Sequence, residues 1–137
     1  MYVVVQRNVK EVIMKTLYIV RGVPGSGKST YCRTVIRVKP FEADDFFMRD
    51  GIYRYVPDMV PKAHDFCKRR CENAMIEGQE IIAVANTFTR KWEYSKYLEL
   101  AEKYGYEVVI HICRGKYKNI HNVPDDVISK MRERFEY

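Results

Sequence analysis

A glycine-rich stretch over residues 22–29, with the sequence GVPGSGKS, constrains this chain more than any other feature. It satisfies every required position of the phosphate-binding pattern G-x-x-x-x-G-K-[ST]. The apolar run 16–20 before it predicts a buried strand, and residues 28–36 after it predict a helix. Strand, loop and helix are the context that this motif requires, so a nucleoside triphosphate site is favoured over a purely structural glycine-rich turn.

The residue types in this stretch suit the phosphates of ATP. Glycines permit backbone conformations in which successive N–H groups turn inward around an anion, and the start of the following helix adds its positive dipole end. Lys28 would contact the β- and γ-phosphates, and the hydroxyl of Ser29 would be a ligand of Mg²⁺. The loop residues expected to bind ATP are Gly22, Val23, Pro24, Gly25, Ser26, Gly27, Lys28, Ser29 and Thr30.

The length of 137 residues predicts one domain over residues 14–137, preceded by an extension over residues 1–13 that is long enough for an edge strand. No apolar window approaches a membrane span, and the apolar run 2–5 is too short for a signal peptide. A cytoplasmic protein without a membrane partner is therefore expected. The net charge of +6 gives weak support for a nucleic-acid partner.

Apolar runs alternate with amphipathic segments along the chain. This alternation predicts a three-layer α/β domain with a mainly parallel sheet of four to five strands flanked by helices. The strands are expected over residues 16–21, 38–43, 80–85 and 106–112, and the helices over residues 28–36, 61–77, 89–104 and from residue 124 onward.

Cysteines and one histidine raise the question of a metal site. His64, Cys67 and Cys71 fall on one face of the helix expected over residues 61–77. A fourth ligand is not evident, so a packed helix face is favoured over a zinc site. Cys32 and Cys113 complete a set of four cysteines that are expected to be reduced thiols.

Two aspartates end the second expected strand, on the side of an open α/β sheet where ligands bind. Asp44 is the candidate base for an attacking hydroxyl and, with Ser29, a candidate contact of Mg²⁺. Asp45 is the second candidate base and is also expected to contact the substrate. The alternative is that the pair caps a turn or binds a metal ion through water.

Two further segments carry candidate binding residues. The aromatic connection 46–60 contains Phe46, Phe47, Tyr53 and Tyr55, interleaved with Arg49 and Arg54. These residues would stack bases and hold phosphates of an acceptor, or else form a hydrophobic plug over the sheet. The basic segment 114–118 contains Arg114 and Lys118, which would close over the ATP phosphates. An ordinary solvated basic loop is the alternative for that segment.

Several short motifs occur in a fixed order over nearly the whole chain. They are Arg21-Gly22-Val23-Pro24-Gly25-Ser26-Gly27-Lys28-Ser29-Thr30, Asp44-Asp45-Phe46-Phe47, Gly51-x-Tyr53, Ala63-His64, Asn86-Thr87-x-Thr89-x-x-Trp92-Glu93, Tyr104-Gly105-Tyr106 and Asn119-x-His121-x-Val123-Pro124. In this set the chain resembles the AAA-type kinase-like domain of the NEDD-four-binding-protein family. It is similar, more distantly, to the 5′-kinase domain of phage polynucleotide kinase.

The resemblance implies a P-loop kinase fold and a reaction that uses ATP and Mg²⁺. The expected activity is transfer of phosphate to the 5′-hydroxyl of DNA or RNA, so single-stranded or end-exposed nucleic acid is the expected partner. Lys28 and Ser29 would contact phosphate and Mg²⁺, Asp44 would be the general base, and Arg114 would engage ATP phosphates. A kinase for a small hydroxyl compound and a nucleotide-binding module with little turnover remain as alternatives.

The chain departs from the family pattern at two positions. Phe47 stands where the phage kinase has a substrate-binding arginine, so Arg49 or Arg54 would have to substitute. Ala85 stands where the family has the aspartate of an Asp-Asn-Thr motif, at or near the position where many NTPases hold Mg²⁺ through a water molecule. The adjacent Asn86 is expected to contact the substrate.

Overall fold

The computed structural model describes residues 14–137. Three parallel strands form its main sheet, in the order β4-β1-β5: β1 (Thr16–Arg21), β4 (Ile81–Asn86) and β5 (Glu107–Ile112). Arg21 at the end of β1 pairs in register with Asn86 and with Ile112. The carboxyl ends of all three strands therefore lie along one edge of the sheet. The edge strand expected within residues 1–13 falls outside the described residues.

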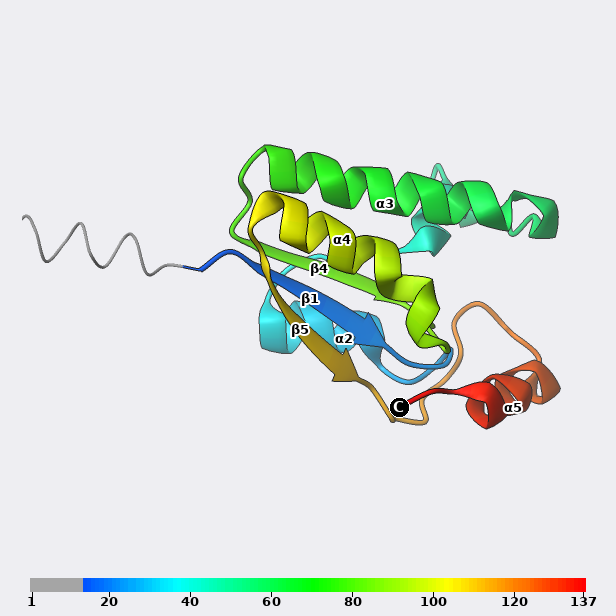
Figure 1. Ribbon diagram of the computed structural model, residues 1–137. Helices are drawn as coiled ribbons and strands as arrows, with labels where there is room; N and C mark the ends of the chain where they lie inside the picture. The colour runs from blue at the N-terminus through cyan, green and yellow to red at the C-terminus, as the bar shows by residue number, and fades with distance from the viewer. Residues whose placement is uncertain (1–13) are drawn as a thin grey trace, which may run out of the picture.

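Helices cover both faces of this sheet (Figure 1), which confirms the three-layer α/β class. One face carries α3 (Val60–Ile76) and α4 (Ser95–Tyr104). The opposite face carries α2 (Lys28–Tyr31), which continues without interruption as a π-helical segment (Cys32–Ile36).

The core divides in the same way, because successive side chains of a strand point to opposite faces. Leu17 and Ile19 pack toward α3 and α4, whereas Val20 packs with Ala83, Ala85 and Cys32 on the α2 side.

Residues 38–43 do not form the strand that was expected there. Only a single bridge, between Phe41 and Val84, joins this segment to β4, so the sheet of the described residues has three strands. Pro40 has no N–H to donate to a ladder. After Glu42 the chain turns into a 3₁₀ helix (Ala43–Phe47), where the side chain of Asp45 accepts from the Glu42 N–H at 3.2 Å. This turn ends the pairing after one residue.

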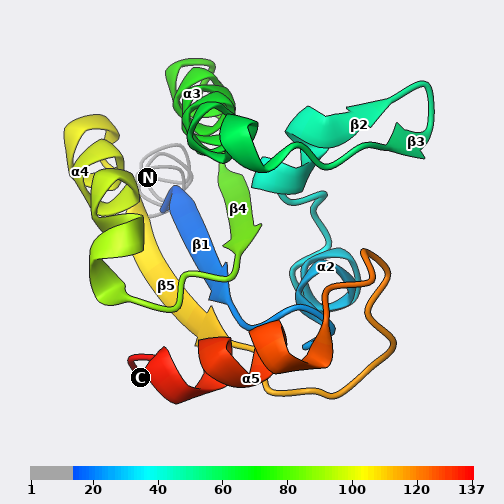
Figure 2. The same ribbon diagram turned by 90° about the vertical axis from the view of Figure 1, so that its right-hand side faces the viewer.

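An antiparallel hairpin follows the 3₁₀ turn and projects beyond the sheet (Figure 2). Its strands are β2 (Met48–Arg49) and β3 (Ile52–Tyr53). Asp50 and Gly51 connect them with φ values of 52° and 76°. Positive φ at both central residues is typical of a type I′ turn, which Asp-Gly favours. A short 3₁₀ turn (Pro57–Met59) then leads into α3.

The carboxyl-terminal half differs from the expected elements only at their ends. The helix expected from residue 89 begins as a 3₁₀ turn (Lys91–Tyr94) before α4, and the last helix, α5, spans Asp125–Arg134. Figure 1 shows α5 beyond the carboxyl ends of β1 and β5. No helix within residues 14–137 has the length and apolar character needed to cross a membrane.

All four cysteines are free thiols, as expected. Cys32, Cys67 and Cys71 are buried and Cys113 is half-buried. Among residues 14–137, no three His, Cys, Asp or Glu side chains converge in a way that could hold a metal ion. Cys67 and Cys71 are buried, whereas His64 is exposed, so of these three residues only the two cysteines pack in the core.

Candidate functional site

The glycine-rich loop lies at the carboxyl end of β1 and leads directly into α2. Gly25 and Gly27 have φ values of 80° and 94°, a region that disfavours any residue with a β-carbon. A β-carbon on Gly22 would lie 2.8 Å from the carbonyl oxygen of Cys113, so that glycine is required by close packing. The glycines of the motif thus shape the loop in the way that the sequence predicts.

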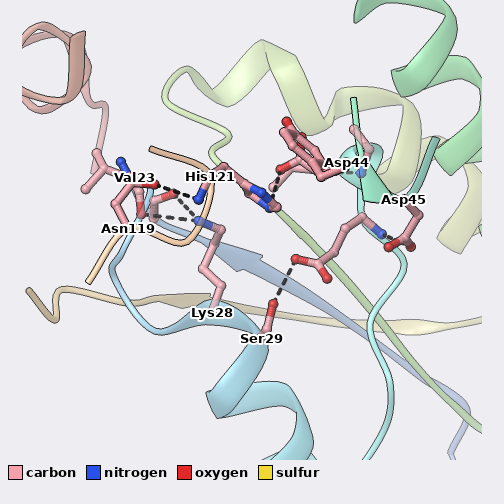
Figure 3. A network of polar contacts seen from close by, with 12 residues as sticks. Val23, Lys28, Ser29, Asp44, Asp45, Asn119 and His121 are labelled. Carbon is pink, nitrogen blue, oxygen red and sulfur yellow. Dashed lines mark hydrogen bonds and ion pairs between the residues drawn. The ribbon is translucent and has the colours of Figure 1, made fainter. Parts of the chain in front are cut away.

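Lys28 lies inside the curve of this loop (Figure 3). Its Nζ donates to the carbonyl oxygens of Gly22 at 2.8 Å and Val23 at 3.2 Å. Burial lowers the pKa of the Lys28 ammonium, and the negative charges of Glu42 and Asp44 act in the opposite direction. A half-buried cation whose partners are two neutral carbonyls can still attract an anion.

Ser29 occupies the first turn of α2, and Thr30 beside it is exposed. The Ser29 hydroxyl donates to Oε1 of Glu42 at 2.9 Å. Burial raises the pKa of Glu42, while the bond from Ser29 lowers it. This contact brings Glu42, an acid that no sequence motif marks, to the glycine-rich loop.

Asp44 extends from the 3₁₀ turn toward the same region as Lys28 and Ser29 (Figure 3). Its Oδ1 accepts from the Tyr53 hydroxyl at 3.0 Å, and its Oδ2 lies 3.5 Å from Nε2 of His121. The rings of Tyr53 and His121 stack at 4.1 Å. Burial and the Asp44 carboxylate raise the pKa of the Tyr53 hydroxyl, which extends the pH range over which it donates to Asp44. Three distant segments therefore meet at Asp44.

The side chains of Asp45 and Asn86 form hydrogen bonds within the protein, with backbone N–H groups of the 3₁₀ turn and with Arg70. Oδ2 of Asp45 accepts from Arg70 at 2.9 Å as well as from the Glu42 N–H. Asn86 is buried, and its Oδ1 accepts from the Ala43 N–H at 2.8 Å. Both side chains thus fix the 3₁₀ turn that presents Asp44.

Three of the residues expected to bind an acceptor on the aromatic connection are separated. Phe47 is 5% exposed and packs in the core, with its ring edge-on to Tyr53 and Tyr55. Arg49 lies exposed on the hairpin and Arg54 is exposed just after it. The hydrophobic plug is therefore the observed arrangement for Phe47, and the two arginines are free of ion pairs in residues 14–137.

The basic segment after β5 lies against the phosphate loop. The N–H groups of Gly115 and Tyr117 donate to the carbonyl oxygens of Ser26 at 3.1 Å and Gly25 at 2.8 Å. A β-carbon on Gly115 would lie 2.8 Å from the Ser26 oxygen, so this approach requires glycine.

The charged side chains of that segment point elsewhere or into solvent. Arg114 packs over the ring of Tyr137 at 4.5 Å, and Lys118 is exposed. The structure thus brings the backbone of the segment to the loop, but it does not bring the Arg114 guanidinium there.

A cavity of about 420 Å³ opens between the first turns of α3 and α4, near the carboxyl end of β4. Its lining is mostly apolar, with charged groups at the rim. Trp92, the single tryptophan of the chain, forms part of the wall and is 73% exposed. The lining residues are Pro61, His64, Asp65, Lys68, Phe88, Trp92, Glu93, Lys96 and Tyr97.

Sequence reasoning missed two residues of the site and one contact of a third. Tyr53 was expected only as part of the aromatic run that stacks bases or plugs the sheet, and not as a partner of Asp44. His121 belongs to the quoted motif Asn119-x-His121, but no role was attached to it. Glu42 had no motif to mark it. Its role depends on the close approach of residue 42 to α2, which the pattern of apolar residues does not reveal.

Known proteins share this fold and sequence pattern. Human NEDD4-binding protein 2 is 28% identical over an alignment of 155 positions, which covers 98% of this chain and 9% of that protein. The 2′,3′-cyclic-nucleotide 3′-phosphodiesterase of Pongo abelii is 28% identical over 105 positions, covering 70% of this chain and 23% of that protein. The chain thus spans under a quarter of these relatives.

Solved structures agree at the level of the fold. A proposed kinase from Chloroflexus aurantiacus has a TM-score of 0.57 at 18% identity, covering 73% of this chain and 59% of that one. The Pnkp1/Rnl/Hen1 complex gives 0.56 at 20% identity, covering 85% and 38%. The AvrRxo1-ORF1:ORF2 complex with ATP gives 0.51 at 18% identity, covering 74% and 37%.

These comparisons confirm the expected likeness to NEDD4-binding protein 2, whereas the Pnkp1 complex supports the likeness to phage polynucleotide kinase only in part. The sequence profile of the AAA domain family matches residues 17–137, from the first strand to the last residue. The matched region contains the glycine-rich loop, Asp44 and His121, which are the centre of the site. By this match, the chain belongs to the AAA domain family of P-loop proteins, and its fold is that of its kinase neighbours.

Proposed function

We propose that this chain transfers the γ-phosphoryl group of ATP to the 5′-hydroxyl of a polynucleotide, in the presence of Mg²⁺. The observation that carries the proposal is the position of Asp44, a carboxylate held by Tyr53 and His121 and close enough to affect the pKa of Lys28. Phosphoryl transfer needs positioning, neutralised charge and a base for the attacking hydroxyl. Lys28 and Asp44 supply the last two.

The proposed reaction is a single phosphoryl transfer, in which one P–O bond forms, one breaks and one proton moves to Asp44. Asp44 accepts the proton as the 5′-hydroxyl oxygen forms a bond to the γ-phosphorus, and the bond from that phosphorus to the bridging oxygen breaks. ADP leaves and a 5′-phosphate ester remains. Lys28 would hold the β- and γ-phosphates, and the loop N–H groups would bind their oxygens.

Mg²⁺ fits the oxygen donors that the site offers. The Ser29 hydroxyl and nearby carboxylates are hard ligands, and Mg²⁺ is commonly held by one or two such groups together with substrate phosphates and water. When bound, the ion would neutralise charge on the β- and γ-phosphates. Ser29 from the glycine-rich loop and Asp44 from the 3₁₀ turn are the proposed contacts of the ion. Arg114 would reach ATP only if it left the ring of Tyr137.

The acceptor side is proposed from the hairpin and the exposed arginines. Tyr53 and Tyr55 stack at 6.5 Å beside Asp44, and Tyr55 is 54% exposed. Arg49 and Arg54 lie on the same hairpin region and would contact phosphates. Exposed aromatic rings interleaved with cations suit a single strand of nucleic acid.

One observation favours a second candidate, a kinase for a small hydroxyl compound. The cavity beside Trp92, about 420 Å³ in volume, has the size of a small-molecule site. A third candidate is a nucleotide-binding module with little turnover, since Ala85 leaves the end of β4 without an acid.

The deciding experiment is transfer of γ-labelled phosphate from ATP to 5′-hydroxyl DNA and RNA oligonucleotides. We expect label on one polymer, and a loss of about 10²- to 10⁴-fold in Asp44→Asn with ATP binding retained. An Asp44→Asn protein with wild-type activity would rule Asp44 out as base. Bound ATP without labelled oligonucleotide would direct the search to small hydroxyl acceptors.

A further inference from the structure

The end of β4 lacks the acid that many P-loop proteins place there, and an alanine methyl fills its position. Ala85 is 1% exposed and packs with Val20 and Cys32 on the α2 face of the sheet. A methyl group provides no ligand for a cation. If this site binds Mg²⁺ through more than Ser29 and Asp44, the additional oxygen ligand has to come from a segment other than β4.

The segment beside β4 brings a carboxylate to the same face. Phe41 bridges to Val84, and its carbonyl oxygen accepts from the Ala85 N–H at 2.9 Å. Phe41 packs against the core on the α3 side. Since Glu42 is extended, with φ −132° and ψ 143°, its side chain points to the opposite face, toward α2. Glu42 therefore lies next to Ala85 and on the same side.

The contact with Ser29 shows that the carboxylate reaches the phosphate loop. Ser29 Oγ donates its proton to Glu42 Oε1 at 2.9 Å, drawn as a dashed line in Figure 3. A hydroxyl that donates its proton keeps its two lone pairs. The bond to Glu42 thus leaves the lone pairs of the Ser29 oxygen available to a cation, and it places the Glu42 carboxylate beside that oxygen.

We propose that Glu42 is the acid that holds Mg²⁺ at this site, together with Ser29, since Ala85 supplies no carboxylate at the end of β4. The inference rests on the proposed binding of ATP and Mg²⁺, and it assigns a residue that no motif marks. Glu42 either binds the ion directly or holds one of its water molecules. Both arrangements need the carboxylate charge.

The test measures Mn²⁺ binding to the protein–ATP complex by electron paramagnetic resonance, with ATP affinity in EDTA measured in parallel by calorimetry. We expect Glu42→Gln to keep metal-free ATP binding and to weaken Mn²⁺ by about 10- to 100-fold. Glu80→Gln is the matched control, because it removes an exposed carboxylate just before the amino end of β4. It should bind Mn²⁺ like the wild type.

A second variant introduces a carboxylate at the end of β4 in place of the one removed from residue 42. Adding Ala85→Asp to Glu42→Gln should recover most of the Mn²⁺ affinity, and a thermal melt of each variant establishes that it is folded. Equal Mn²⁺ affinity in the wild type and in folded Glu42→Gln overturns the role of Glu42 alone. Absence of ATP binding by the wild type overturns the proposed function and this inference with it.

Discussion

Lys28 is half-buried and donates its charged ammonium group to two backbone carbonyls. Replacing it in Lys28→Met removes the charge that the phosphates of ATP would meet. Hydrogen bonds to charged groups contribute about 1.5–3 kcal/mol, so ATP affinity should fall about 10- to 100-fold. Calorimetric titration with ATP checks this, and Lys39→Met, at an exposed lysine, is the control. Unchanged affinity in Lys28→Met would refute the assignment of the loop.

Cys113 differs from the other three cysteines because it is half-buried. Its carbonyl packs against Gly22, and burial raises the pKa of its thiol, an effect that Lys28 partly offsets. Only the thiolate reacts with iodoacetamide, so a raised pKa means that alkylation needs a higher pH than that of a free cysteine. Mass spectrometry should show Cys113 modified first, at a rate that rises with pH. Earlier modification of Cys32, whose pKa burial raises to about 12, would contradict the arrangement.

At the scale of elements, one buried arginine joins β1 to the carboxyl-terminal segment. Arg21 is 1% exposed and donates to the backbone oxygens of Phe88, Thr89 and Glu136. Its guanidinium also packs over the rings of Tyr94 and Phe135. The strand that precedes the phosphate loop is thereby connected to the segment after α5.

Removing this cation in Arg21→Met should leave the carbonyl oxygens of Phe88 and Glu136 without their side-chain donor. We expect the free energy of unfolding to fall by about 2–4 kcal/mol, measured by urea denaturation. Arg33→Met, at an exposed arginine next to α2, should leave stability within about 0.5 kcal/mol of the wild type. A wild-type midpoint for Arg21→Met would mean that these contacts contribute little.

At the scale of the whole molecule, the net charge of +6 and the exposed Trp92 make acceptor binding measurable. A labelled single-stranded oligonucleotide bound at the hairpin should show a rise in fluorescence anisotropy, whereas a small hydroxyl compound in the cavity should quench the fluorescence of Trp92. Three phosphate contacts would weaken binding about 20-fold between 50 and 200 mM salt, because counterions are released. Quenching by a small hydroxyl compound with no salt dependence would favour the second candidate. Trp92→Phe should remove the signal while fluorescence anisotropy of a labelled strand still reports binding.

The sequence by itself determined the class of fold and the phosphate loop. Both depend on local patterns: the apolar runs 16–20 and 81–85 for the parallel sheet, and the spacing of three glycines, Lys28 and Ser29 for the loop. Each of these patterns lies within one short segment, so it can be recognised without knowing how distant segments pack. The sequence also placed Asp44 at the carboxyl end of the sheet.

Only the tertiary structure decided which side chains surround Asp44 and which are structural. Tyr53 and His121, 68 residues apart, meet through stacking, and Glu42 reaches Ser29 because residue 41 bridges to β4. The structure also shows that Asn86 fixes a backbone turn and that Phe47 fills the core, while their contact with a substrate stays a prediction. Contacts between distant segments depend on how the layers pack, and no local pattern of residues encodes that geometry.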